Sequence, residues 1–211
     1  LANDPDADRL AVVVNHKDNW CRLNGNEIGV LLAEHILSKG QGEDRLVVTT
    51  VVSSRLLSKI ADFHKVKYAE TLTGFKWIVR PGLEDKNSRF VFGYEEALGF
   101  ALGDSVRDKD GITSALAFAE LAAELKAEDK TVMDLLDELW NRHGVHKTAL
   151  FTKRLDAETD ISADFMSPWR TSPPERIGEF VVIESIDLLT PESGLPATDA
   201  LVFNILNGRI V

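Results

Sequence analysis

Three aspartates near the start of the chain have the spacing of a metal site. Asp4, Asp6 and Asp8 occupy alternate positions of a short loop that also contains Pro5 and Arg9. Their carboxylates offer hard oxygen ligands, which suit Mg²⁺, and they need a positive counter-charge because like charges this close repel. Arg9 could supply that charge or donate a bidentate hydrogen bond to a phosphate. The simpler alternative is a solvated acidic turn.

The same spacing occurs in calcium-binding EF-hand loops, but two positions exclude such a loop. Arg9 stands at the sixth position, where an EF-hand needs glycine, and Asn15 stands at the twelfth, where it needs glutamate. The EF-hand interpretation therefore fails.

The stretch from Gly93 to Gly111 contains the densest group of chemically useful side chains. It follows an apolar run and precedes a helical pattern, and such strand-to-helix junctions bind ligands in open α/β sheets. Its glycines permit positive φ and a close approach to a ligand. The charged residues are Glu95, Glu96, Arg107, Asp108, Lys109 and Asp110. A solvated surface loop is the alternative interpretation.

A third loop places a hydroxyl, a flexible backbone, an aromatic ring and a cation within four residues. These are Thr73, Gly74, Phe75 and Lys76. This mixture suits a sugar phosphate, because a lysine can meet the phosphate charge while the backbone and ring shape the pocket. Alternatively, the loop is a strand-to-helix turn that buries Phe75 and Trp77, which is the account we favour for these two aromatics.

Together the three segments resemble the α-D-phosphohexomutase superfamily of phosphoglucomutases and phosphomannomutases. Residues 4–9 resemble its magnesium loop, and residues 73–77 resemble its sugar-recognition loop. Residues 93–96 and 107–111 resemble its hydroxyl-reading glutamate loop and the basic segment that follows. The resemblance covers most of residues 1–145 and is closest to the branch of phosphomannomutases and phosphopentomutases.

The resemblance implies an enzyme that interconverts sugar 1-phosphate and 6-phosphate of glucose or mannose, or the corresponding pentose phosphates. It implies Mg²⁺, a phosphoserine donor and a bisphosphorylated sugar intermediate. It assigns Lys109 and Arg9 to catalysis. We expect Glu96 instead to be a structural partner of Arg107 or Lys109. The implied metal ligands are Asp4, Asp6 and Asp8, and the implied substrate-binding residues are Thr73, Gly74, Lys76, Glu95 and Arg107.

The chain also departs from the family pattern. Ala97 stands where many relatives have serine, and neither the phosphoserine loop nor the second phosphate-binding loop of the family occurs in the sequence. We expect these loops before Leu1 and after Val211, so the isolated chain should be an inactive fragment. Two alternatives remain: a non-catalytic α/β module that binds a sugar phosphate or a partner, and, more weakly, a magnesium-dependent phosphatase.

Periodicity and capping residues predict the elements that carry these loops. Asn24 or Asn26 should cap the first helix, Ser53 or Ser54 the second, and Thr131 with Asp134 the last. Strands separated by helices predict a three-layer α/β/α domain with a mainly parallel sheet, followed by part of a smaller α+β domain. The expected strands are 10–14, 46–52, 66–72, 89–94, 147–154, 180–186 and 200–205. The expected helices are one that starts after its cap and ends at Gly40 and Gly42, one with residues 56–63, a short one broken at Pro81, 112–126, and one from the Thr131 cap to Gly144.

These elements predict three parts: residues 1–24 as the end of the second mutase domain, 25–145 as the third, and 146–211 as a linker and an incomplete C-terminal domain. The last eleven residues should form a hairpin. Residues 112–126 are apolar on more than one face, which predicts a well buried helix.

Composition limits the partners. Among 211 residues, 34 are acidic and 24 basic, giving a net charge of −10. This balance argues against binding to nucleic acids or anionic membranes. Cys21 is the only cysteine, and no apolar run approaches the length of a membrane span. We expect a cytoplasmic protein; the sequence leaves its oligomeric state open.

Overall fold

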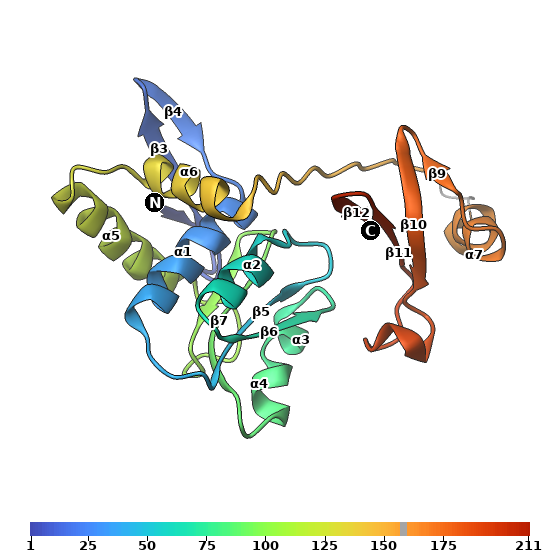
Figure 1. The fold of residues 1–211 in the computed structure, drawn as a ribbon, viewed down its shortest axis with the longest axis horizontal. Helices are drawn as coiled ribbons and strands as arrows, with labels where there is room; N and C mark the ends of the chain where they lie inside the picture. Colours follow the sequence, from blue (N-terminus) through green and yellow to red (C-terminus); the bar gives the residue numbers. More distant parts are fainter. Residues whose placement is uncertain (157–159) are drawn as a thin grey trace. The chain divides into compact units, whose positions relative to one another are not determined.

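A four-stranded sheet with the strand order β6-β5-β7-β8 forms the centre of the first 148 residues (Figure 1). In this computed structural model, which describes residues 1–156 and 160–211, β6 (Lys67–Thr71), β5 (Arg45–Thr50) and β7 (Arg89–Glu95) run parallel. β8 (Gly99–Leu102) returns antiparallel beside β7. Every residue of β5 is buried, as expected for a strand covered on both faces.

Helices cover both faces of this sheet, which confirms the three-layer prediction. Val47 faces the larger core, which includes side chains from α1 (Gly25–Lys39), α2 (Leu56–Phe63) and α5 (Gly111–Ala127). Its neighbours Leu46 and Val48 face a smaller core with α3 (Phe75–Ile78), since successive residues of a strand point to opposite faces. The short helix α4 (Arg80–Glu84) lies beside α3, and α6 (Val132–His143) packs against α1 and α2.

Local capping explains where two of the helices begin and end. Asn24 and Glu27 form a capping box at α1, and Thr131 and Asp134 form another at α6, as predicted. Gly40 and Gly144 follow these helices. At α2 the prediction was only close: Ser54 accepts a hydrogen bond from the backbone of Leu56 (3.2 Å), but Arg55 is the residue that precedes the helix.

Several expectations were wrong. The α5 helix is not buried all round, because Ile112 and Leu116 are 66% and 72% exposed. Pro81 lies in the first turn of α4 rather than breaking a helix, a position where its missing N–H costs nothing. Residues 147–154 form no strand, and Leu150 and Phe151 are exposed.

The first 24 residues contain more strand than expected. β1 (Ala2–Asn3) pairs with β2 (Leu10–Ala11), and β3 (Val13–His16) forms a hairpin with β4 (Asn19–Arg22). They belong to the same compact unit as residues 25–148. Their assignment to the end of a preceding domain stays a prediction.

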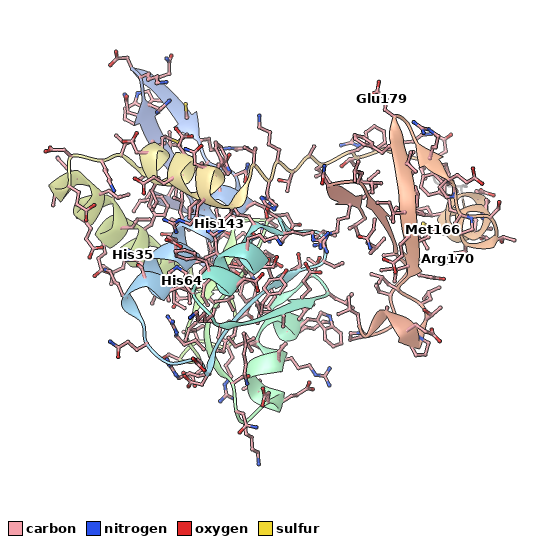
Figure 2. The ribbon with its side chains drawn as sticks, in the orientation of Figure 1. His35, His64, His143, Met166, Arg170 and Glu179 are labelled. Carbon is pink, nitrogen blue, oxygen red and sulfur yellow. The ribbon has the colours of Figure 1, made fainter. Side chains whose placement is uncertain are left out.

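Residues 149–211 form a second compact unit, with an antiparallel sheet in the order β12-β11-β10-β9. The sheet buries Phe203, whose ring meets Trp169 of α7 at 5.5 Å. Arg170 of the same helix, labelled in Figure 2, binds Asp187 at 3.1 Å and also Asp199. The elements are η1 (Ser162–Met166), α7 (Ser167–Thr171), β9 (Arg176–Ile177), β10 (Phe180–Asp187), η2 (Pro191–Ser193), β11 (Leu201–Ile205) and β12 (Gly208–Ile210).

The pairing of β11 with β12 is the predicted terminal hairpin. Across the described residues of both units, no helix has the length and apolar character that crossing a bilayer requires.

Candidate functional site

The aspartate loop between β1 and β2 gathers its three carboxylates on a tight turn. The backbone N–H of Ala7 donates to the carbonyl of Asp4 (3.0 Å), and Ala7 has a φ of 59°. The N–H of Arg9 donates to the Asp4 carboxylate (3.0 Å). One oxygen from each of Asp4, Asp6 and Asp8 then lies within 4.8 Å of the others. These hard oxygen donors fit the demands of Mg²⁺.

Two cations balance this negative charge. The Arg9 guanidinium lies 4.0 Å from the carboxylates of both Asp4 and Asp8. The ammonium group of Lys109 lies 3.0 Å from Asp8 and 3.3 Å from Asp108. Desolvation lowers the pKa of Lys109, but the two carboxylates outweigh it and raise this pKa above its ordinary value. Lys109 is therefore protonated at neutral pH and can donate a proton or stabilise negative charge.

A close approach at Gly111 brings Lys109 to the aspartate loop. A Cβ at Gly111 would lie 2.5 Å from the carbonyl oxygen of Arg9 and 2.7 Å from that of Ala7. Asp110 caps α5 by accepting from two backbone N–H groups, and its own N–H donates to Phe100 (2.8 Å). The start of α5 is thus fixed against the loop on one side and β8 on the other.

Glu95 ends β7 and faces this cluster from the sheet. It is 6% exposed, and burial raises its pKa, while the nearby Lys109 opposes that rise. The backbone N–H of Gly74 interacts with its carboxylate. A Cβ at Gly99 would lie 2.8 Å from Lys109, 2.8 Å from Phe75 and 2.9 Å from the Glu95 carboxylate. Gly99 is therefore the point where these three side chains converge.

The loop of residues 73–77 follows β6 and enters the site through its backbone. Gly74 has a φ of 111°, and the buried Phe75 ring lies 5.6 Å from the Lys109 ammonium group. Thr73 and Lys76 are exposed beside it. Trp77 is half-buried, with Lys76 and Arg80 each 5.3 Å from its ring, so the expectation of a core position was wrong for this tryptophan.

Arg107 is not brought to this cluster. It lines a cavity of about 170 Å³ with Arg89 and Phe90, at the start of β7. Glu95 ends the same seven-residue strand, and six residue steps at about 3.3 Å span roughly 20 Å. This placement does not support a direct substrate contact from Arg107.

Glu96 also differs from expectation, because its carboxylate pairs with hydroxyls rather than with Arg107 or Lys109. It accepts hydrogen bonds from Ser53 (2.8 Å) and from Thr50 (3.3 Å), at the carboxyl end of β5. Neither hydroxyl was predicted to lie beside the candidate site. The sequence signal that could have indicated them is the group of hydroxyl residues at the end of the buried strand, Thr49, Thr50, Ser53 and Ser54.

The whole cluster lies where the order of the parallel strands reverses. The chain goes from β5 to β6 on one side, then crosses to β7 on the other. In open α/β sheets, ligands bind outside the carboxyl ends of the strands at such a point. Glu95, Glu96 and the residue 73–77 loop all follow these ends. The arrangement can hold a divalent cation, a phosphate and a polyhydroxyl compound together.

Comparisons with known proteins find similar sequences and folds. The family model described as phosphoglucomutase/phosphomannomutase, alpha/beta/alpha domain III, matches residues 24–143. The probable phosphomannomutase of Haemophilus influenzae is 38% identical over 210 residues, which are 99% of this chain and 41% of that protein. A phosphoglucomutase of Staphylococcus aureus is 34% identical over 198 residues, 91% of this chain and 36% of the relative.

A probable phosphoribomutase of Schizosaccharomyces pombe is 30% identical over 233 residues, covering 100% of this chain and 40% of the relative. The chain therefore spans about two-fifths of the length of these relatives. A crystal structure of a Thermus thermophilus protein assigned as a phosphomannomutase matches with a TM-score of 0.57 and 24% identity, covering 68% of this chain and 30% of that one. This likeness shows a shared fold.

Proposed function

Because the chain belongs to the phosphoglucomutase/phosphomannomutase family, we propose that it forms the metal-binding and sugar-binding part of a phosphohexomutase. Enzymes with these names are isomerases that move a phosphoryl group within one molecule. The observation that carries the proposal is the convergence of Lys109 with Asp8 on one side and Glu95 on the other. The aspartates there can bind a metal ion, Lys109 can bind a phosphate, and Glu95 can accept hydrogen bonds from sugar hydroxyls.

Asp4, Asp6 and Asp8 are the proposed metal ligands. The fit rests on three carboxylate oxygens gathered within 4.8 Å and on the lowered pKa of Asp4. Desolvation raises that pKa, but the backbone hydrogen bond from Arg9 and the other interactions of the loop outweigh it, so the carboxylate stays ionised. Bound Mg²⁺ would supply positive charge that offsets the charge of a transferring phosphoryl group.

Around that charge, the protein's own residues position and stabilise the substrate. Protonated Lys109 stabilises negative charge on a phosphoryl oxygen or donates a proton to a sugar oxygen. Glu95 accepts hydrogen bonds from sugar hydroxyls, and Gly74 holds it in place. The exposed Thr73 and Lys76 would contact the substrate, with Lys76 at a phosphate. We further propose a phosphoserine donor and a bisphosphorylated sugar intermediate, with catalysis by placement and electrostatics.

The substrate class follows from the relatives. Glucose and mannose phosphates come first, since relatives named phosphoglucomutase and phosphomannomutase match the chain. A pentose phosphate comes second, because one relative is named a phosphoribomutase. We also propose a cytoplasmic location, on the strength of the acidic composition and the single cysteine.

Replacing one carboxylate of the loop tests the proposal. In the full-length protein, Asp6→Asn should abolish Mg²⁺-dependent conversion of glucose or mannose 1-phosphate into 6-phosphate. Asp137→Asn makes the same change on the exposed face of α6 and should keep the wild-type rate. Retained Mg²⁺-dependent activity in Asp6→Asn would overturn the metal assignment. A folded wild-type protein without mutase activity toward hexose or pentose phosphates would overturn the function.

A further inference from the structure

Glu96 is next to the buried Glu95, yet no cation pairs with its carboxylate among the described residues. Its partners are the hydroxyl groups of Ser53 and Thr50, which are 4% and 0% exposed. These two hydroxyls lie 2.7 Å apart and also hydrogen-bond to each other. The Glu96 side chain is thereby tied to the carboxyl end of β5, the strand beside β7.

The backbone of Glu96 is held as firmly as its side chain. A Cβ at Gly25 would lie 2.1 Å from the carbonyl oxygen of Glu96 and 2.7 Å from its carbonyl carbon. The first turn of α1 therefore packs directly on this peptide group. Two residues later, the carbonyl of Leu98 accepts from the N–H of Leu10 (3.1 Å), and Leu98 has a φ of 67°. The turn from β7 to β8 is thus fixed on three sides.

Fixing Glu96 also fixes the direction of Glu95. The peptide bond between them is planar, and adjacent side chains at the end of a strand point to opposite sides. While Glu96 faces Ser53, Glu95 faces Gly74, Phe75 and Lys109. We propose that Glu96 is a positioning residue, which binds Ser53 and Thr50 so that the Glu95 carboxylate stays aimed at the sugar hydroxyls. This inference rests on the proposed mutase function and identifies what orients its sugar-reading group.

The choice of hydroxyl partners has an electrostatic consequence. Hydroxyls hold the Glu96 carboxylate without cancelling its charge, whereas an arginine or lysine would neutralise it. Burial is the main cause of the raised pKa of Glu95, and Lys109 opposes it; the Glu96 charge raises this pKa further, while the Gly74 N–H and Arg9 lower it. A residue that only fills space would not act on this pKa, so the pH dependence separates the two roles.

Steady-state kinetics of the full-length protein with Mg²⁺ and glucose or mannose 1-phosphate test the proposal. Glu96→Ala should lower kcat/KM about 10-fold or more, mainly through KM, as expected when the partner of a substrate-binding group is lost. Glu96→Gln keeps an acceptor for one hydroxyl and should recover most of that loss. Ser53→Ala should lower kcat/KM, and should add little in combination with Glu96→Ala, because both remove the same link.

The pH dependence of kcat/KM is a measurement that a purely packing role of Glu96 would not change. In Glu96→Gln the acid limb of kcat/KM should shift to lower pH, because the charge that raises the Glu95 pKa is gone. Glu43→Ala, an exposed glutamate before β5, is the matched control and should leave kinetics and profile unchanged. If Glu96→Ala fails to fold, Glu96→Gln still decides through its profile.

Suppose that the wild-type protein is an active mutase. Unchanged kinetics in Glu96→Ala, or an unshifted acid limb in Glu96→Gln, would then overturn the positioning role and leave the mutase function standing. Absence of mutase activity in the folded wild-type protein would overturn the proposed function itself, and the inference with it.

Discussion

At the scale of single residues, Gly99 is where the components of the candidate site meet. It pairs with Arg9 from the aspartate loop, and the space that a Cβ would need is filled by three side chains. Glycine is required here by close packing, since no positive φ is involved. The catalytic candidate Lys109 and the sugar-reading candidate Glu95 depend on this one missing methyl group.

Gly99→Ala should therefore displace Lys109, Phe75 or Glu95. Overpacking of this kind costs about 1–3 kcal/mol of unfolding free energy, measurable by urea denaturation. In the full-length protein, mutase activity should fall by a larger factor than stability alone explains. Gly208→Ala is a suitable control, because its Cβ would stay 3.5 Å from the nearest atom. Equal stability in Gly99→Ala and wild type would show that the site has room to relax.

The ionised Glu95 carboxylate is expected to lower the free energy of unfolding at neutral pH. Its pKa is raised chiefly by burial, so its favourable contribution is present below the unfolded pKa and is lost as pH rises through the folded value. Glu95→Gln should raise the unfolding free energy at pH 7.5, and this gain should vanish near pH 4. Urea titrations at both pH values measure the difference. A variant less stable than wild type at pH 7.5 would contradict the expectation.

At the scale of elements, the junction of α1, α2 and α6 is built around one carboxylate. Glu34 of α1 is 8% exposed and binds His64 (2.8 Å) and Arg142 (2.8 Å). Figure 2 labels His64 and the neighbouring His143 at this junction. The Phe63 ring contacts the Arg142 guanidinium at 4.6 Å and lies 5.6 Å from the His143 ring. Three helices thus meet at one carboxylate, with Arg142 and two histidines at their ends beside it.

This junction should respond to acid through His143. Burial, followed by Arg142, lowers the pKa of His143; His64 and His146 add to this, and only Glu34 opposes it. A lowered histidine pKa gives stability that is present above the ordinary value and is lost as pH falls through the folded one. Wild-type unfolding free energy should therefore fall between pH 7 and pH 5.

His143→Gln should lose less stability over the same range, as measured by urea denaturation at several pH values. His16→Gln, on the β3–β4 hairpin, should follow the wild-type curve. A wild-type decline that persists in full in His143→Gln would assign the acid sensitivity to another group.

Sequence patterns predicted the elements whose signals are local. The capping box of Thr131 and Asp134, and the β-branched run of β5, depend on neighbours a few residues away. Leu116 shows the limit of the same reasoning: its apolar character predicted burial, but the described structure leaves it exposed. Periodicity gives the face of a helix, whereas burial depends on what covers that face.

The candidate site was predictable in its residue types and less so in its pairings. The carboxylates of residues 4–8 and Lys109 meet because Gly111 allows two distant segments to touch, which spacing alone does not reveal. Arg107 is only two residues from Lys109 in the loop between β8 and α5. Its side chain nevertheless lies at the start of β7, whereas Lys109 lies near Glu95 at the end of that strand. Glu96 was expected to pair with a cation, and tertiary packing gave it hydroxyls instead.

At the scale of the whole molecule, the chain divides between Thr148 and Ala149 into two compact units. The segment from Gly144 to Asp156 carries no helix or strand, and Leu150 and Phe151 are 91% and 88% exposed. Backbone that is exposed and without regular hydrogen bonds is a preferred site of proteolytic cleavage.

Brief trypsin treatment should therefore cut first at Lys147, Lys153 or Arg154. Mass spectrometry should identify a resistant fragment that begins at Leu1 and ends at one of these residues. Lys126, in the last turn of α5, and Lys130, between α5 and α6, serve as internal controls and should be cut later. Cleavage within α1 to α6 before cleavage at these three sites would contradict the expectation that the first unit is protected.

The lack of room at Gly111 also restricts how such enzymes can be recombined. The turn of residues 4–9 and the start of α5 fit together with backbone against backbone, so neither can change shape alone. A hybrid that takes one segment from one parent and the other from a distant relative would misplace the lysine relative to the aspartates. Successful chimeras should inherit both segments as a pair, although about a hundred positions separate them along the chain.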